Sequence, residues 1–235
     1  MFKLIQKDLL VGLKIKSLKA TIITFIFGLF LLTTFSYIFP TLLPMMITFI
    51  VVMNSFYYDS LNKSESFIAS LAHKREDIVY SKYILTVTIL FVSLIMVYVL
   101  YGINILSSVR VMVLQDVSVS MATILLSFSI IIPIILKYGY KIGRIAAPII
   151  TIFVGYMTYK NTSAYEFINT GKETLLISFS RKIGTLIFKI FNLKNYDYKI
   201  MSMNVYLILI FGIGLTLFII SLYISLRIYK NKDLA

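Results

Sequence analysis

Long uncharged apolar runs alternate with short polar segments along the whole chain of 235 residues. A membrane-spanning helix needs about 20 consecutive apolar residues, because the hydrocarbon core of a bilayer is about 30 Å thick. Most of the runs reach or approach that length, whereas 145–159 is clearly shorter. The pattern predicts an all-α integral membrane protein, with spans at residues 20–39, 41–58, 83–106, 119–136, 145–159 and 203–226.

The first two runs together are too long for one helix. A single helix over about forty residues would measure about 60 Å, twice the thickness of the hydrocarbon core. Pro40 and Pro44 lie between the runs, and proline interrupts helices, so we expect a tight turn there. The chain then returns, at Asp59, to the side of the membrane from which it entered.

Two further segments show apolar residues at helical spacing with polar residues on other faces. In 1–19 the polar faces carry lysines, which predicts a helix lying in the membrane interface with its lysines toward anionic headgroups. Its apolar face consists of Phe2, Ile5, Leu9 and Leu13. In 160–202 a narrow polar stripe runs from Ser178 to Asn192, which predicts a helix in or dipping into the membrane surface.

The segment 59–82 is the longest polar stretch in the first half of the chain. Its charged residues are Asp59, Lys63, Glu65, Lys74, Arg75, Glu76, Asp77 and Lys82, and it also holds His73, the one histidine of the sequence. Phe67, Ile68 and Leu71 form an apolar face over about two helical turns. A new helix is expected near Arg75, because acidic residues in a first turn favour a helix N-terminus. Polarity alone favours an ordinary solvated loop.

Composition narrows the possible chemistry. Hydrophobic residues make up 59% of the chain, there is no cysteine, and a single histidine cannot build a histidine-rich metal site. The net charge is +13, but the lysines and arginines lie mainly between apolar runs. This distribution fits anionic membrane lipid and argues against nucleic acid as a partner. No metal site and no cofactor bound by this chain is therefore expected.

No ionisable residue lies inside a predicted span, which argues against a proton-coupled transporter and against an intramembrane enzyme. The basic loop 137–144 contains Gly139 and Gly143, but it lacks the spacing and the GK[ST] ending of a phosphate-binding loop. No catalytic residue is therefore predicted. Either the protein is passive, or a partner at its polar surface supplies the energy.

Two topologies remain open from the residues alone. With six spans, the N-terminal segment, 59–82, 137–144 and the C-terminal tail share one side, which the positive-inside rule places in the cytoplasm. If 145–159 does not cross, five spans result, and counting lysines and arginines favours that alternative. The count does not decide, because the basic residues around 181–189 would lie on a surface helix.

The sequence FIASLAHKREDIVYSKYI at 67–84 resembles the cytoplasmic segment of type-2 ABC transporter permeases, which reads like LLSLPxSRKEIVLxKYL. The matching residues are Ser70, Leu71, Arg75, Asp77, Ile78, Val79, Lys82 and Tyr83. The opening MFKLIQKDLL is also similar to the basic amphipathic start of that family. Two departures are Ala72, where the family has proline, and the pair His73-Lys74, which replaces a less charged pair.

The resemblance implies a six-helix permease half with cytoplasmic termini in a bacterial-type plasma membrane. Residues 59–82 would form a coupling helix that docks on a separate ATPase subunit, which would bind ATP and magnesium. The implied coupling residues are Glu65, Phe67, Ile68, Leu71, His73, Lys74, Arg75, Glu76 and Asp77. Residues 160–202 would re-enter from the outer face, which favours six spans over five.

The resemblance also implies a function and its partners. The protein would be the permease subunit of an ATP-driven exporter, paired with an identical or different permease half. Its length and cysteine-free, Tyr- and Lys-rich character are most similar to exporters of phenol-soluble modulins, so an amphipathic peptide is the expected class of substrate. The substrate-binding residues remain unknown. The alternative is a membrane protein without transport function, such as an immunity or sensor factor that binds a peptide or a partner.

Overall fold

The computed structural model describes residues 2–13, 39–61, 75–102, 114–162, 175–191 and 198–231. Every regular element within these ranges is a helix, as predicted for an all-α protein. The elements are α1 (Phe2–Gly12), α3 (Phe39–Leu61), α5 (Arg75–Gly102), α6 (Leu114–Tyr138), α7 (Tyr140–Thr162), α9 (Leu175–Phe191) and α10 (Tyr198–Lys230). All but the last residue of the predicted span 20–39, and most of the predicted coupling segment, lie outside the described residues.

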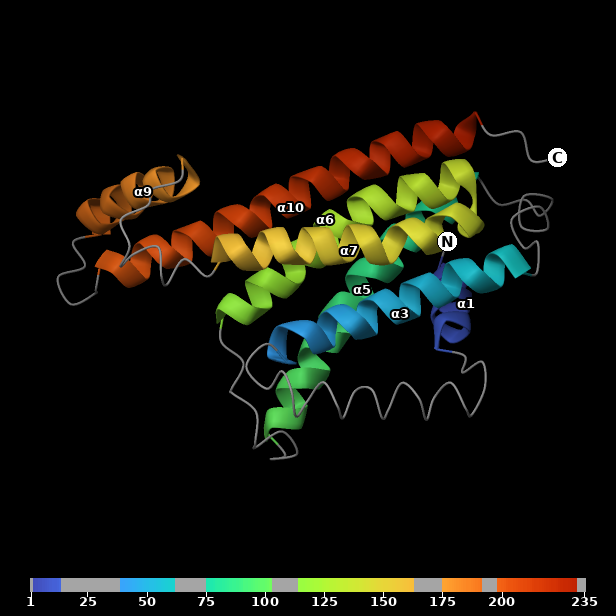
Figure 1. Ribbon diagram of the computed structural model, residues 1–235, viewed down its shortest axis with the longest axis horizontal. Coiled ribbons are helices and arrows are strands. Elements are labelled where there is room, and N and C mark those ends of the chain that lie inside the picture. The colour runs from blue at the N-terminus through green and yellow to red at the C-terminus, as the bar shows by residue number, and fades with distance from the viewer. Residues whose placement is uncertain are drawn as a thin grey trace.

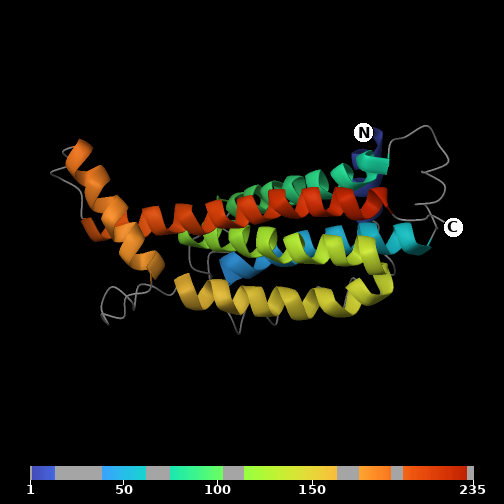
Figure 2. The ribbon, with the colours of Figure 1, turned by 90° about the horizontal axis from the view of Figure 1, so that it is seen from above.

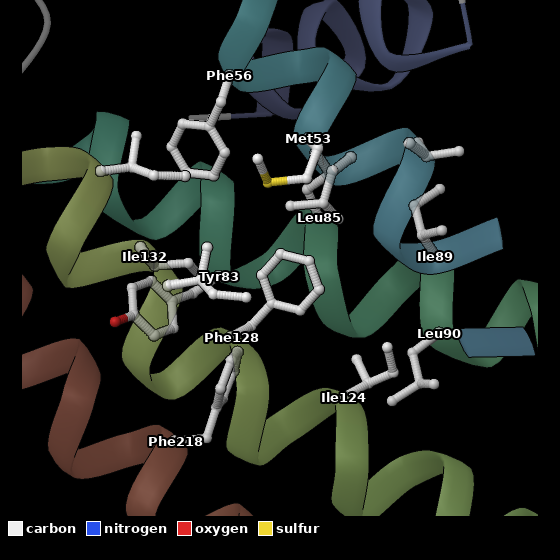
Figure 3. Packing of buried hydrophobic residues seen from close by; sticks show 14 of the residues in the cluster. Met53, Phe56, Tyr83, Leu85, Ile89, Leu90, Ile124, Phe128, Ile132 and Phe218 are labelled. Atoms are coloured by element: carbon white, nitrogen blue, oxygen red, sulfur yellow. The ribbon is translucent and has the colours of Figure 1, made fainter. Parts of the chain in front are cut away.

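Four of the described helices, α3, α5, α6 and α10, are long and apolar enough to cross a membrane. Their facing side chains form the main core (Figure 3), in which Phe128 of α6 is fully buried and lies 6.2 Å, ring centre to ring centre, from Phe49 of α3. Tyr83 of α5 packs against Phe218 of α10 at 4.8 Å. The core therefore ties helices that are distant in sequence into one bundle.

The two ends of the bundle differ in what they carry (Figures 1 and 2). α1, the C-terminal end of α3, the junction of α6 with α7 and the end of α10 lie at one end. α9 lies at the other end, against the beginning of α10.

A one-residue break separates α6 from α7. Gly139 has a φ of 83°, a left-handed conformation that glycine adopts without strain, and its amide donates to the carbonyl of Ile135 at 2.8 Å. Gly143 then lies so close to Ile135 that an added Cβ would come within 2.2 Å of that side chain. Glycine at these two positions lets α7 fold back directly along α6 (Figure 2).

α7 is longer than the apolar run that predicts it. It covers 23 residues and so measures about 35 Å, whereas the run 145–159 would measure about 22 Å. The extra turns begin with Tyr140 and include the exposed Lys141 and Arg144, whose charges end the apolar run but not the helix. α7 is not among the four helices that qualify as spans by composition.

The prolines at the start of α3 are accommodated within a helix. α3 begins at Phe39, so Pro40 occupies its first turn, where no backbone N–H is needed. Pro44 lies inside α3, and the hydroxyls of Thr48 and Ser93 donate to its carbonyl at 2.8 Å and 3.3 Å. The prediction of a tight turn at Pro40 and Pro44 is therefore wrong, because both prolines lie within α3.

α9 falls within the predicted amphipathic segment 160–202. Ser180 and Gly184 are buried on the side that packs against α10. The other side exposes both charged and apolar side chains, among them Lys182, Phe179 and Leu186. A helix with that mixture on its outer side suits a boundary between water and lipid.

Candidate functional site

An acidic side chain of α1 points into the bundle. Leu4, Asp8 and Gly12 are one turn apart, all three are buried, and α1 packs against α3 and α5. Leu10 and Leu13 are exposed instead. The predicted apolar face of 1–19 therefore does not describe how α1 docks, because its docking face includes Asp8.

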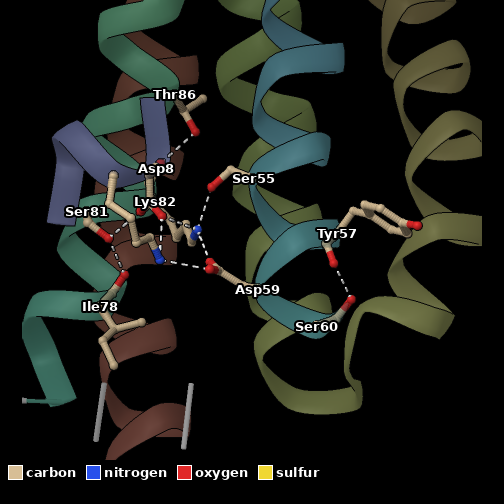
Figure 4. A network of polar contacts seen from close by, with 10 residues as sticks. Asp8, Ser55, Tyr57, Asp59, Ser60, Ile78, Ser81, Lys82 and Thr86 are labelled. Carbon is tan, nitrogen blue, oxygen red and sulfur yellow. Dashed lines mark hydrogen bonds and ion pairs between the residues drawn. The ribbon is translucent and has the colours of Figure 1, made fainter. Parts of the chain in front are cut away.

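Asp8 meets charged residues of two other helices (Figure 4). Lys82 of α5 places its Nζ 2.9 Å from Asp8 Oδ1 and also donates to Asp59 Oδ2 of α3. Lys7 Nζ lies 2.8 Å from Asp59 Oδ1 and 3.1 Å from Asp8 Oδ1. We call Lys7, Asp8, Asp59 and Lys82 the charge cluster; its contacts join α1, α3 and α5 pairwise.

Two serines complete the hydrogen bonding of the charge cluster. Lys82 Nζ donates to Ser55 Oγ at 2.6 Å, so its three N–H groups have three acceptors, one each on Asp8, Asp59 and Ser55. Ser81 Oγ donates to Asp8 Oδ2 at 2.9 Å. The ring of Phe56 lies 5.0 Å from the Lys82 ammonium. The buried lysine is thus fully paired.

The charge cluster is buried and its formal charges cancel. The side chains of Asp8, Lys82 and Asp59 are 1%, 3% and 10% exposed, whereas that of Lys7 is 33% exposed. Burial by itself lowers the pKa of Lys7, but the Asp8 and Asp59 carboxylates outweigh it, and the net pKa of Lys7 is raised. The cluster thus pairs two basic with two acidic side chains, which is how a protein tolerates ions away from water.

This arrangement corrects one interpretation of the sequence. The predicted spans 41–58 and 83–106 stop one residue short of Asp59 and Lys82, and so they appear free of charge. The helices do not stop there: Asp59 lies inside α3 and Lys82 lies two turns inside α5, both within the stretches that qualify as membrane spans. Buried ion pairing, rather than the absence of charge, distinguishes this end of the bundle.

Tyr83, the neighbour of Lys82, ties α5 to the opposite side of the bundle. Its hydroxyl lies 2.7 Å from Ser221 Oγ and 2.8 Å from Ser225 Oγ of α10. Ser221 in turn donates to the carbonyl of Ser129 on α6. Lys82 and Tyr83 are both among the residues that match the permease segment. Lys82 contacts α1 and α3, whereas Tyr83 contacts α10.

The predicted coupling residues are only partly described. Glu65, Phe67, Ile68, Leu71, His73 and Lys74 lie outside the described residues. Arg75, Glu76 and Asp77 form the first turn of α5, where Glu76 is exposed and Asp77 is half-buried. Acidic side chains there interact favourably with the positive end of the helix dipole.

Sequence reasoning missed Asp8, Asp59 and Lys82 as site residues. A signal for one of them existed, because Asp8 is the only acidic residue among the first 58 and lies one turn from Leu4 and Gly12. Nothing local could supply its partner, since Lys82 is 74 residues away. The cluster is a product of tertiary packing.

Two apolar grooves flank α7. The groove between α3, α6 and α7 has a volume of about 700 Å³, and the one between α6, α7 and α10 about 470 Å³. No charged side chain lines either of them. The larger groove includes Met45, Phe49 and Ile152, with hydroxyl groups from Thr123 and Thr151. Such walls suit an apolar or amphipathic molecule.

Within the ranges that the structure describes, no group of three histidine or acidic side chains could hold a metal ion. The family described as "ABC-2 family transporter protein" matches residues 3–230. No curated protein and no solved structure shows a significant match to the chain.

Proposed function

Because the chain belongs to the ABC-2 family of membrane transporter proteins, we propose that it is the permease subunit of an ATP-driven exporter. It forms half of a translocation path and pairs with a second, identical or different, permease half. The family match carries this proposal, since it extends over 3–230 and includes every described helix. The chain itself is a multi-pass membrane protein and not an enzyme on its own.

In this proposal a separate ATPase subunit docks between α3 and α5. Its contacts are Phe67, Ile68 and Leu71 as apolar anchors, with Glu65, His73, Lys74 and the first turn of α5 around them. ATP and magnesium bind to the ATPase. Closure of two ATPase subunits pulls on the segment 62–74 between α3 and α5 of each permease half, which we call the docking segment. The absence of a phosphate-binding loop in the sequence supports an external source of energy.

We assign six spans, with 20–39 as the first and α7 as the fifth, and both termini in the cytoplasm. Support comes from the position of α1, the α6–α7 junction and the end of α10 at one end of the bundle (Figure 1). That end also carries Lys141, Arg144 and Arg227, as the positive-inside rule requires of a cytoplasmic side. α9 then lies at the outer face.

The substrate in this proposal is amphipathic or hydrophobic, such as a small cytolytic or antimicrobial peptide. The uncharged walls of the two grooves support this class, because a highly charged substrate would need paired charges along its path. Similarity in length and composition to exporters of phenol-soluble modulins points to the same class.

Co-purification from the native membrane tests the proposal. The tagged wild-type chain should retain an ATPase subunit, and Phe67→Asp combined with Leu71→Asp should release it. The matched control is Phe179→Asp with Leu186→Asp, which places the same charges on exposed positions of α9, at the other end of the bundle. Retention of the ATPase by the Phe67/Leu71 variant would refute the docking assignment. If the wild-type chain retains no ATPase, the alternative function as an immunity or sensor protein is favoured.

A further inference from the structure

The charge cluster lies at the base of the segment that joins α3 to α5. Asp59 belongs to the last turn of α3, Lys82 lies two turns into α5, and their ion pair joins these two helices near the ends that the segment connects. We propose that Asp59, Lys82 and Asp8 are positioning residues that hold the two ends of this segment at a fixed spacing. This inference rests on the proposed function, in which the ATPase pulls on the segment.

The contacts of the charge cluster form a closed triangle. Asp8–Lys82 joins α1 to α5, Asp59–Lys82 joins α3 to α5, and Lys7–Asp59 joins α1 to α3. A single ion pair between two helices would permit rotation about it, whereas three pairs between three helices do not. The three helix ends therefore move as one body.

α1 has a second attachment, one turn beyond Asp8. The side-chain amide of Asn54 donates to the carbonyl of Gly12 at 3.3 Å. Gly12 also approaches α3 so closely that an added Cβ would come within 2.7 Å of the Val51 carbonyl oxygen. Two attachments prevent α1 from pivoting, so this helix acts as a brace across the base of the docking segment.

The charge cluster stays closed while the transporter works, because opening it would separate ions that are buried. The Lys82 ammonium and the Asp8 carboxylate are almost fully buried. If the pair separated there, water could not solvate either ion, and the separation would cost free energy. A pull on the docking segment is then transmitted to α3 and α5 together instead of spreading them apart.

The spacing can be measured directly. Ser60 and Glu76 are exposed, lie on the two sides of the segment, and can be changed to cysteine for spin labelling in this cysteine-free chain. The distance between the two labels is recorded by electron paramagnetic resonance in lipid nanodiscs. ATP hydrolysis by the retained ATPase, with and without the permease, is the second readout, and it is measured on chains without label or cysteine, because Glu76 belongs to the proposed ATPase contacts.

The decisive variant is Asp59→Asn combined with Lys7→Gln. It removes both ion pairs to α3, leaves the Lys82–Ser55 hydrogen bond, and keeps the Asp8–Lys82 pair balanced, so the protein does not carry an unpaired buried charge. The matched control is Thr48→Val, which removes a 3.3 Å contact with Ser93 between the same two helices, far from the charge cluster. Both variants are compared with wild type for folding before either readout.

We expect one narrow label distance in wild type and in Thr48→Val, and a broad or shifted one in the double variant. Permease-dependent ATP hydrolysis should fall in the double variant alone, because a pull on the docking segment no longer moves α3 and α5 together. A change in only one readout, or in neither, overturns the inference. Failure of the proposed function would give a different result, because the wild-type chain would then retain no ATPase.

Discussion

Replacing Lys82 with methionine should destabilise the bundle more than any other change of a single lysine among the described residues. Methionine keeps the length of the side chain but removes the ammonium that pairs with Asp8 and Asp59. Both carboxylates would then share Lys7, which is 33% exposed and lies 3.1 Å from one and 2.8 Å from the other. One negative charge is left without compensation in a buried site.

The size of the effect follows from this imbalance. Removing one partner of a buried ion pair costs about 3–5 kcal/mol, because the other charge stays buried and unpaired. Lys7 still neutralises one carboxylate and Ser81 still donates to Asp8, so we expect the lower end, about 3 kcal/mol. This equals a change of about 100-fold in the unfolding equilibrium, since about 1.4 kcal/mol corresponds to a factor of ten.

The assay is unfolding by a denaturing detergent in mixed micelles, followed by circular dichroism. Lys141→Met is the control, because Lys141 is exposed on α7 and its loss should change the unfolding free energy by less than about 0.5 kcal/mol. Adding Asp8→Asn to Lys82→Met restores the charge balance and should recover part of the loss. If Lys82→Met unfolds like Lys141→Met, the charge cluster does not hold α1, α3 and α5 together.

Three further predictions concern the rest of the bundle. Gly143→Ala forces a Cβ against Ile135 and should lower the unfolding free energy by about 1–3 kcal/mol, and Ile135→Ala in the same chain should relieve that overpacking. Tyr83→Phe loses the hydroxyl that contacts two serines of α10 and should cost about 1 kcal/mol in the same assay; an unchanged midpoint would show that those contacts contribute nothing. An impermeant thiol reagent on intact cells should label Lys182→Cys but reach Lys141→Cys only after lysis, and the reverse order would contradict the proposed orientation.

The membrane class and the family could be predicted from the sequence because they depend on local properties. Apolar runs predict helices by their length, as the runs within α3, α5, α6 and α10 show. The family resemblance rests on contiguous residues of 67–84 and agrees with the family match over 3–230. Neither property requires knowledge of which helices touch.

The charge cluster could not be predicted, because its residues pair with residues that are distant in the sequence. Asp59 and Lys82 are two of the charged residues that make 59–82 a polar segment, and Asp8 lies in a segment whose lysines predict an interfacial helix. A charged residue ends an apolar run whether it faces water or a buried counter-ion, so hydropathy places the ends of spans too early. The same effect shortened the predicted fifth span, where Lys141 and Arg144 lie within α7.

Site-specific photo-crosslinking from the docking segment shows directly whether an ATPase binds there. A photoreactive amino acid replaces Phe67 in the full chain, and native membranes are irradiated before solubilisation. We expect one major protein adduct, which mass spectrometry identifies as a protein with an ATP-binding motif and no membrane span. An adduct with a protein that binds no nucleotide, or only with lipid, would contradict the claim that this segment receives an ATPase.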